Sequence, residues 1–181
     1  MAARLTKLQK NLQQEQELLA KYKSLGYPDE WIELRMQYFR THRAVVDAWK
    51  KRGAKTKQEH DELTDIILFT WSSHHTDEYK ELIKDIKPDD DLHDHMTMSE
   101  LAIATHGEKE ALNIMNSYYI TSKVSNQDVA RWGGKKAAQI CQNTEKKYGT
   151  IIVTRRSYPR WKIEQARKKQ QPNLLDRIKE N

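Results

Sequence analysis

The sequence predicts a mainly α-helical protein: a single helical domain with an N-terminal helical arm and at most a minor β element near residues 150–154. A length of 181 residues and a mass of 21.4 kDa fit one ordinary domain. The chain has six Gly and four Pro, which disfavours turn-rich sandwiches and barrels. Large apolar residues recur with the spacing of one helix face, and three segments carry the capping pattern of a helix start.

Residues 1–26 are predicted to form the helical arm, with the helix itself over residues 3–25. Its apolar residues fall near heptad a and d positions over about three heptads. They are Leu5, Leu8, Leu12, Leu19 and Tyr22. This stripe can pair two copies of the chain in a homodimer or pack on the domain, and the heptad spacing favours self-association. Gly26-Tyr27-Pro28 ends the helix.

Residues 27–171 are predicted to form the helical domain, and residues 172–181 a polar tail. The first domain helix begins at Pro28-Asp29-Glu30, because Pro fits the first turn and the acids face the positive end of the helix dipole. This helix extends to Gly53. The apolar residues that recur along it are predicted to lie in the core: Trp31, Leu34, Tyr38, Val45 and Trp49.

Three capping patterns predict further helix starts: Thr56 with Glu59, Thr97 with Glu100, and Ser125 with Asp128. A short helix around Tyr79, Leu82 and Ile83 and a polar loop up to Met96 are expected between the first two of these helices.

The helix that starts at Ser125 is predicted to end near Gly149, since Gly is the usual residue just past a helix end. The β-branched residues 150–154 that follow are predicted to form the minor strand. A last helix is expected from Pro159 to about Gln170.

The composition excludes several classes of protein. Cys141 is the only cysteine, so an internally disulfide-bonded scaffold is excluded, and we expect this residue in the core. No run of about 18 apolar residues is present, and the N-terminus lacks the apolar core of a signal peptide, so we expect a soluble intracellular protein. No P-loop, dinucleotide fingerprint or G-x-S-x-G motif is present, and we expect no cofactor.

Charge is distributed unevenly along the chain. The net charge is +3 over residues 1–50, −7 over residues 51–110 and +10 over residues 111–181. A basic C-terminal third beside an acidic middle region favours contact with a polyanion or an acidic partner. The alternative is that the two regions face each other within one molecule or across a dimer.

The basic residues of the C-terminal third are interleaved with Tyr158 and Trp161. Cationic side chains neutralise phosphates and aromatic rings can stack on bases, so this region is the candidate nucleic-acid interface. A solvated helix with one buried face has the same composition, and that interpretation stays open. The candidate residues are Arg131, Lys135, Lys136, Arg155, Arg156, Arg160, Lys162, Arg167 and Lys168.

A second candidate site is the histidine and aspartate cluster formed by His74-His75, Asp89-Asp90-Asp91 and His93-Asp94-His95. A metal-dependent nuclease would use Asp89, Asp91, His93, Asp94 and His95 as ligands. Neighbouring residues of an extended loop point in different directions, however, and the i,i+4 spacing of a helical metal site is missing. A solvated acidic loop ahead of the Thr97 cap is the favoured interpretation. Gly133-Gly134 lacks the spacing of a phosphate-binding Walker A motif and is expected within a helix. It is therefore interpreted as a close packing contact.

Several motifs together resemble a known family. In order they are Trp31, Arg35, Arg43, Asp47-Ala48-Trp49-Lys50, Gly53, Leu63-Thr64-Asp65-Ile66, Tyr79-Lys80, Asp94-His95-Met96-Thr97, Glu100-Leu101, Gly107-Glu108, the stretch from Asn143 to Gly149, and Val153-Thr154. They resemble the C-terminal region of phage antirepressors of the BRO type, including the DNA-damage-inducible protein D group, over roughly residues 29–160. That family usually carries an N-terminal BRO domain, thought to bind DNA, where this chain has a short helix.

The resemblance implies a phage or prophage setting and a regulatory role. We therefore expect a non-enzymatic, antirepressor-like protein in the cytoplasm of a bacterial host cell. Its expected partner is a host or phage protein (a repressor, a DNA-repair protein or a defence effector), with DNA as a further partner. The alternatives are a phage inhibitor of a host immunity effector, such as an anti-CRISPR protein, and the metal-dependent nuclease.

Overall fold

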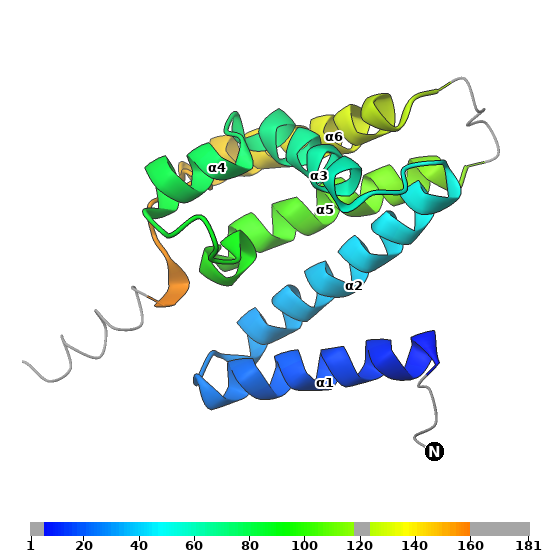
Figure 1. Cartoon of the computed structure of the whole chain (residues 1–181). Helices are drawn as coiled ribbons and strands as arrows, with labels where there is room; N and C mark the ends of the chain where they lie inside the picture. Colours follow the sequence, from blue (N-terminus) through cyan, green and yellow to red (C-terminus); the bar gives the residue numbers. More distant parts are fainter. Residues whose placement is uncertain (1–5, 118–123, 160–181) are drawn as a thin grey trace, which may run out of the picture.

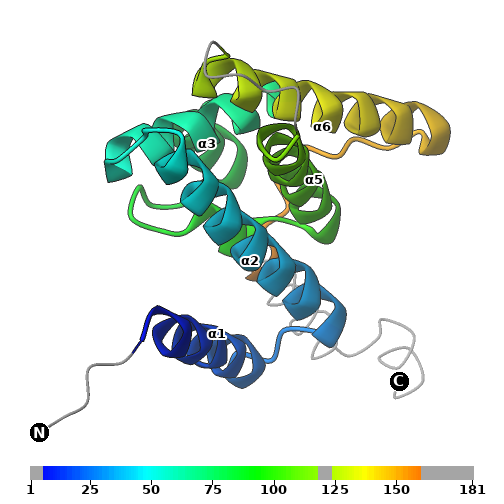
Figure 2. The same cartoon turned by 90° about the vertical axis from the view of Figure 1, so that its right-hand side faces the viewer.

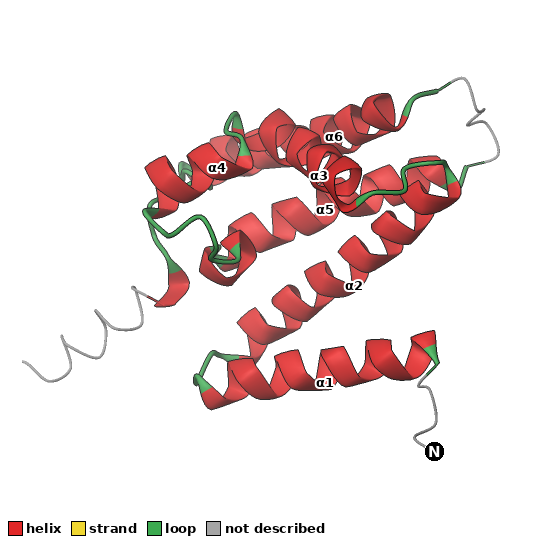
Figure 3. Ribbon diagram, viewed as in Figure 1, coloured by secondary structure: helices red, strands yellow, loops and turns green. Residues whose placement is uncertain are grey.

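The computed structural model describes residues 6–117 and 124–159, and these residues form a mainly α-helical domain. The helices are α1 (Lys7–Ser24), α2 (Asp29–Lys51), α3 (Lys57–Ser72), α4 (Thr76–Glu78), α5 (Met98–Met115) and α6 (Asn126–Tyr148). A π-helical turn, η1 (Tyr79–Lys84), continues α4, and a 3₁₀ turn, η2 (Leu92–His95), precedes α5. The described part of the chain contains no strand (Figure 3).

Each helix start predicted from a capping pattern is confirmed. The side chains of Thr56, Thr97 and Ser125 accept hydrogen bonds from the backbone N–H three residues later. Thr6 caps α1 in the same way, with Gln9 completing a capping box. Local hydrogen bonding therefore defines where α1, α3, α5 and α6 begin, whereas α2 starts after Pro28 without a side-chain cap.

Helix α5 lies at the centre of the domain and packs against α2, α3 and α6 (Figures 1 and 2). The core around it includes the completely buried side chains of Trp31, Trp49, Tyr79 and Leu101. Of the core residues predicted in α2, Leu34 alone is only partly buried.

Glycines allow the closest approach between these helices. A Cβ atom on Gly133 would lie 2.5 Å from the carbonyl oxygen of Gly107 in α5, and one on Gly134 would lie 2.5 Å from Cβ of Thr70 in α3. The interpretation of Gly133-Gly134 as a packing contact is confirmed, because any side chain here would force the three helices apart.

The arm helix α1 packs along α2, at the opposite end of the domain from α6 (Figures 1 and 2). Tyr22 is buried, and Glu15 binds Arg40 and Arg43 of α2 at 2.9 and 2.6 Å. Leu8 and Leu12 are 67% and 51% exposed. Part of the predicted heptad stripe therefore faces away from the domain, and self-association through it stays a prediction.

Residues 150–154 form no strand, so the minor β element that the sequence allowed there is absent and the prediction of a mainly α-helical fold is confirmed. The backbone N–H groups of Ile152 and Thr154 donate to the side-chain carboxylates of Glu145 and Glu100, at 2.8 and 3.2 Å. These carboxylates take the place of a neighbouring strand, and the apolar side chain of Ile152 is buried in the core. The predicted last helix, apart from its first residue Pro159, and the polar tail lie outside the described residues.

The helices of the described part are all too short or too polar to span a lipid bilayer.

Candidate functional site

Helix α6 has two faces of different composition. Its inner face packs on α3 and α5 through small residues that are buried, among them Ala130, Gly133, Ala137 and Cys141. The predicted core position of Cys141 is confirmed, and burial raises the pKa of its thiol to about 11. The outer face carries five exposed cations: Arg131, Lys135, Lys136, Lys146 and Lys147.

Arg131 pairs with Asp128, but the four lysines of this face are not neutralised by acids of the same helix. The carboxylates of α6 belong to Asp128 and Glu145. Asp128 belongs to the first turn, where it binds Ser125 and Arg131, and the carboxylate of Glu145 accepts the N–H of Ile152. Within the described residues, the four lysines of the outer face form no ion pair. From Arg131 to Lys147 the basic face is about 24 Å long at the rise of an α-helix.

An exposed aromatic ring lies within this basic face. Trp132 is 41% exposed and stands one helical turn before Lys135 and Lys136. An indole ring beside cationic side chains is typical of surfaces that stack on bases and bind phosphates.

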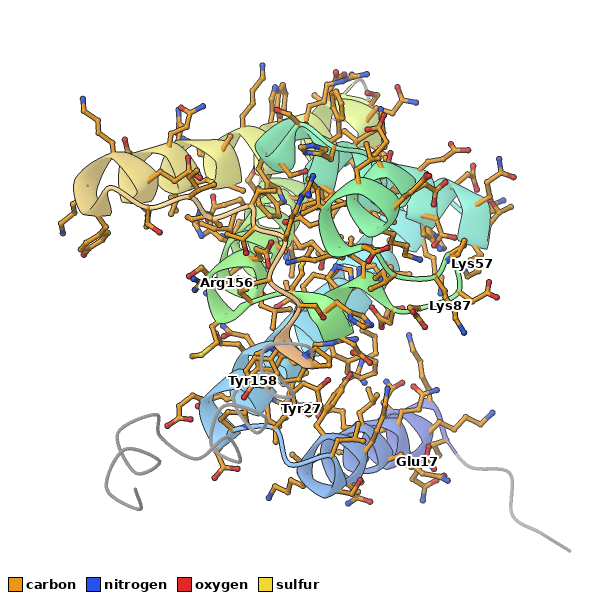
Figure 4. The ribbon with its side chains drawn as sticks, turned by 90° about the vertical axis from the view of Figure 1, so that its left-hand side faces the viewer. Glu17, Tyr27, Lys57, Lys87, Arg156 and Tyr158 are labelled. Atoms are coloured by element: carbon orange, nitrogen blue, oxygen red, sulfur yellow. The ribbon has the colours of Figure 1, made fainter. Side chains whose placement is uncertain are left out.

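Arg155 and Arg156 are exposed on the segment that follows α6. Their backbone is held in place because Nζ of Lys84 donates to the carbonyl oxygens of Thr154 and Arg156, each at 2.8 Å. Figure 4 shows this segment leading from Arg156 to Tyr158, whose ring stacks on that of Tyr27 at a centroid distance of 5.0 Å.

The structure brings three residues of the predicted nucleic-acid interface onto one helix face. Arg131, Lys135 and Lys136 share the outer face of α6, and Arg155 and Arg156 follow on the next segment. The remaining predicted residues, Arg160, Lys162, Arg167 and Lys168, lie outside the described residues. Sequence analysis missed Lys146 and Lys147, although their spacing of eleven residues from Lys135 and Lys136 repeats a position on the helix face.

No ion pair among the described residues supports the alternative that the basic C-terminal third faces the acidic middle region. None of its described cations forms an ion pair there with a carboxylate of residues 51–110. Carboxylates of the acidic region bind other partners. Arg35 of α2, for example, binds Asp91 and Asp94 at 2.6 and 2.9 Å.

The histidine and aspartate cluster does not converge on one point. Asp91 and Asp94 are bound to Arg35, Nδ1 of His93 lies 3.2 Å from Asp91, and Nδ1 of His95 hydrogen-bonds the segment after α6 instead. Burial raises the pKa of Asp91, but the hydrogen bond from His93 and the charge of Arg35 outweigh it and hold the pKa well below its usual value. Over residues 6–117 and 124–159, no three His, Cys, Asp or Glu side chains are arranged to hold a metal ion.

The chain matches no protein-family model, no curated protein sequence and no solved structure. The fold and the basic face of α6 define the class of this protein only as a mainly α-helical protein with a cationic surface. The resemblance to BRO-type antirepressors stays a prediction.

Proposed function

We propose that this chain is a non-enzymatic binding protein whose basic face, formed by the outer face of α6 with Arg155 and Arg156, contacts nucleic acid. The observation that carries the proposal is the row of exposed lysines on α6, Lys135, Lys136, Lys146 and Lys147, which have no acidic partner among the described residues. Like charges gathered on one face repel one another, and a polyanion that lies along the face removes this repulsion. Binding of phosphates also releases counterions, which favours association at low salt.

The kind of contact follows from the side chains. Lysine is a flexible point charge suited to phosphate oxygens, and phosphate contacts position a protein without reading the base sequence. Trp132 adds a ring that can stack on an unpaired base. We therefore expect binding without sequence preference.

The biological setting is proposed from the sequence. The resemblance to BRO-type antirepressors supports a phage or prophage regulator in the bacterial cytoplasm. In that role the protein would bind a repressor or a DNA-repair protein and change the partner's hold on DNA, while the basic face of α6 keeps the complex on the nucleic acid.

Salt-dependent binding to a labelled DNA duplex, followed by fluorescence anisotropy, tests the interface. If both lysines contact phosphates, the double variant Lys135→Ala/Lys136→Ala binds more weakly, and its log–log salt slope is shallower by about 1.8. The matched control is Lys50→Ala/Lys51→Ala, which removes two adjacent exposed lysines from the end of α2.

The control should bind like the wild type, and unrelated duplexes should be bound equally well. Absence of binding of the wild-type chain to duplex DNA at low salt would refute the proposal. A control variant that loses as much affinity as the α6 variant would also refute it.

A further inference from the structure

A large acidic cavity lies between α2, α3 and the loop around η2. Its volume is about 880 Å³, and no residue of α6 lines it. Figure 4 shows Lys57, one of its lining residues, on the side of the molecule opposite the C-terminal end of α6. The cavity is therefore a separate feature from the basic face.

Negative charge dominates the wall of the cavity. The cationic lining residues are Arg35, Lys57 and Lys80, and the acidic ones are Asp61, Glu62, Asp65, Asp77, Asp89, Asp90 and Asp91. Arg35 is bound to Asp91, and Lys57 to Asp61. Among the described residues, Asp77 and Asp89 form no ion pair, and both are exposed. A cavity with this wall favours a cationic occupant.

Glu108 is a buried carboxylate with one oxygen atom that accepts no hydrogen bond among the described residues. Glu108 is 1% exposed, and its Oε1 is bound by the hydroxyl of Tyr38 at 3.1 Å and by Nδ1 of His42 at 2.7 Å. Its Oε2 has no hydrogen-bond partner among the described residues. A buried acceptor left without a donor costs free energy, so a donor that reaches it is favoured.

A second, smaller cavity of about 20 Å³ shares several lining residues with the large one. It is lined by Glu108 and by Trp71, whose buried indole N–H also has no partner in the described part of the chain. Tyr38 and His93 line both cavities, and their rings stack at a centroid distance of 3.9 Å. These two rings therefore belong to the walls of both cavities.

We propose that the acidic cavity binds the guanidinium group of an arginine side chain from a basic segment of a partner protein. The planar guanidinium can stack on the exposed side of the ring pair while its N–H groups donate to the carboxylates of the wall. The His93 side chain, which is 20% exposed, lines both this cavity and the small cavity of Glu108, so a guanidinium stacked on it would lie next to the small cavity.

Titration of the full chain with agmatine, a guanidinium compound without a carboxylate, tests the site. The readout is the NMR signal of the Trp71 indole N–H, assigned with Trp71→Phe, and we expect it to shift and saturate. N-butylurea has a similar shape without the charge and should give no saturable shift. A short capped peptide with one arginine should bind at least as tightly as agmatine.

Variants at the wall make the test specific. Asp77→Asn/Asp89→Asn should weaken agmatine binding about tenfold, the effect of two unit charges each about 6 Å from the cation in a water-like dielectric. Glu33→Gln/Glu81→Gln removes two exposed acids elsewhere and should bind like the wild type.

Three results would overturn the proposal: no saturable shift with agmatine, equal binding of butylurea, or equal affinity of the Asp77/Asp89 variant. Binding of agmatine but not of the arginine peptide would reject the protein partner. The proposed nucleic-acid interface is untouched by each of these outcomes, because the basic face of α6 has its own assay.

Discussion

The buried ion pair between Lys84 and Glu100 makes a strong prediction about stability. Both side chains are 0% exposed, and Nζ of Lys84 lies 2.7 Å from Oε2 of Glu100. The same ammonium group donates to the carbonyl oxygens of Thr154 and Arg156. Lys84→Met leaves the buried carboxyl group of Glu100 without its cation, and it leaves two carbonyl groups without their donor. Removing one partner of a buried ion pair costs about 3–5 kcal/mol, and we expect a loss of this size in the free energy of unfolding.

Urea denaturation followed by far-UV circular dichroism measures this loss. The double variant Lys84→Met/Glu100→Gln should be more stable than the sum of the two single changes predicts, because no unpaired charge remains in the interior. Lys87→Met changes an exposed lysine nearby and should stay within about 0.5 kcal/mol of the wild type. A Lys84→Met protein within about 1 kcal/mol of the wild type would show that the pair does not hold this region together.

Two further predictions concern pH and packing. Burial lowers the pKa of His42, but the adjacent carboxylate of Glu108 outweighs it and raises the pKa above its usual value. The stabilisation from a protonated His42 is therefore complete below about pH 6.5 and is lost as the pH rises through the raised pKa, so urea unfolding should show a flatter pH dependence for His42→Gln. Gly134→Ala places a Cβ atom 2.5 Å from Thr70 and should lower the free energy of unfolding by about 1–3 kcal/mol, whereas the exposed Gln139→Ala should change it by less than about 0.5 kcal/mol. Equal stability of the two alanine variants would contradict the tight contact.

The helices could be predicted because their starts are encoded locally. Thr56, Thr97 and Ser125 each reach a backbone N–H only three residues away, so the signal lies within one short stretch of sequence. The conformation of residues 150–154, in contrast, is not encoded locally. Whether residues 150–154 pair with a strand or with the carboxylates of Glu145 and Glu100 depends on which elements lie beside them in the fold.

Of the two candidate sites, one could be predicted from the sequence and the other depends on the fold. Lys135 and Lys136 could be found from the charge of the sequence, because exposed charges keep their character in any fold. The acidic cavity could not be found, since it needs α2, α3 and the loop around η2 to meet. Glu108 carries no sign of burial in the sequence either, and its unused acceptor is visible only when α5 is placed at the centre of the domain.

The glycine contact of α6 has a consequence for how this protein can change over evolutionary time. Gly133 and Gly134 fix the inner face of the helix, because their positions tolerate no side chain. Residues of the outer face, such as Lys136, make no contact that the fold requires. Substitutions can therefore accumulate on one side of α6 while the other side preserves the arrangement of the three helices. The exposed surface of α6 can therefore change without a change of fold.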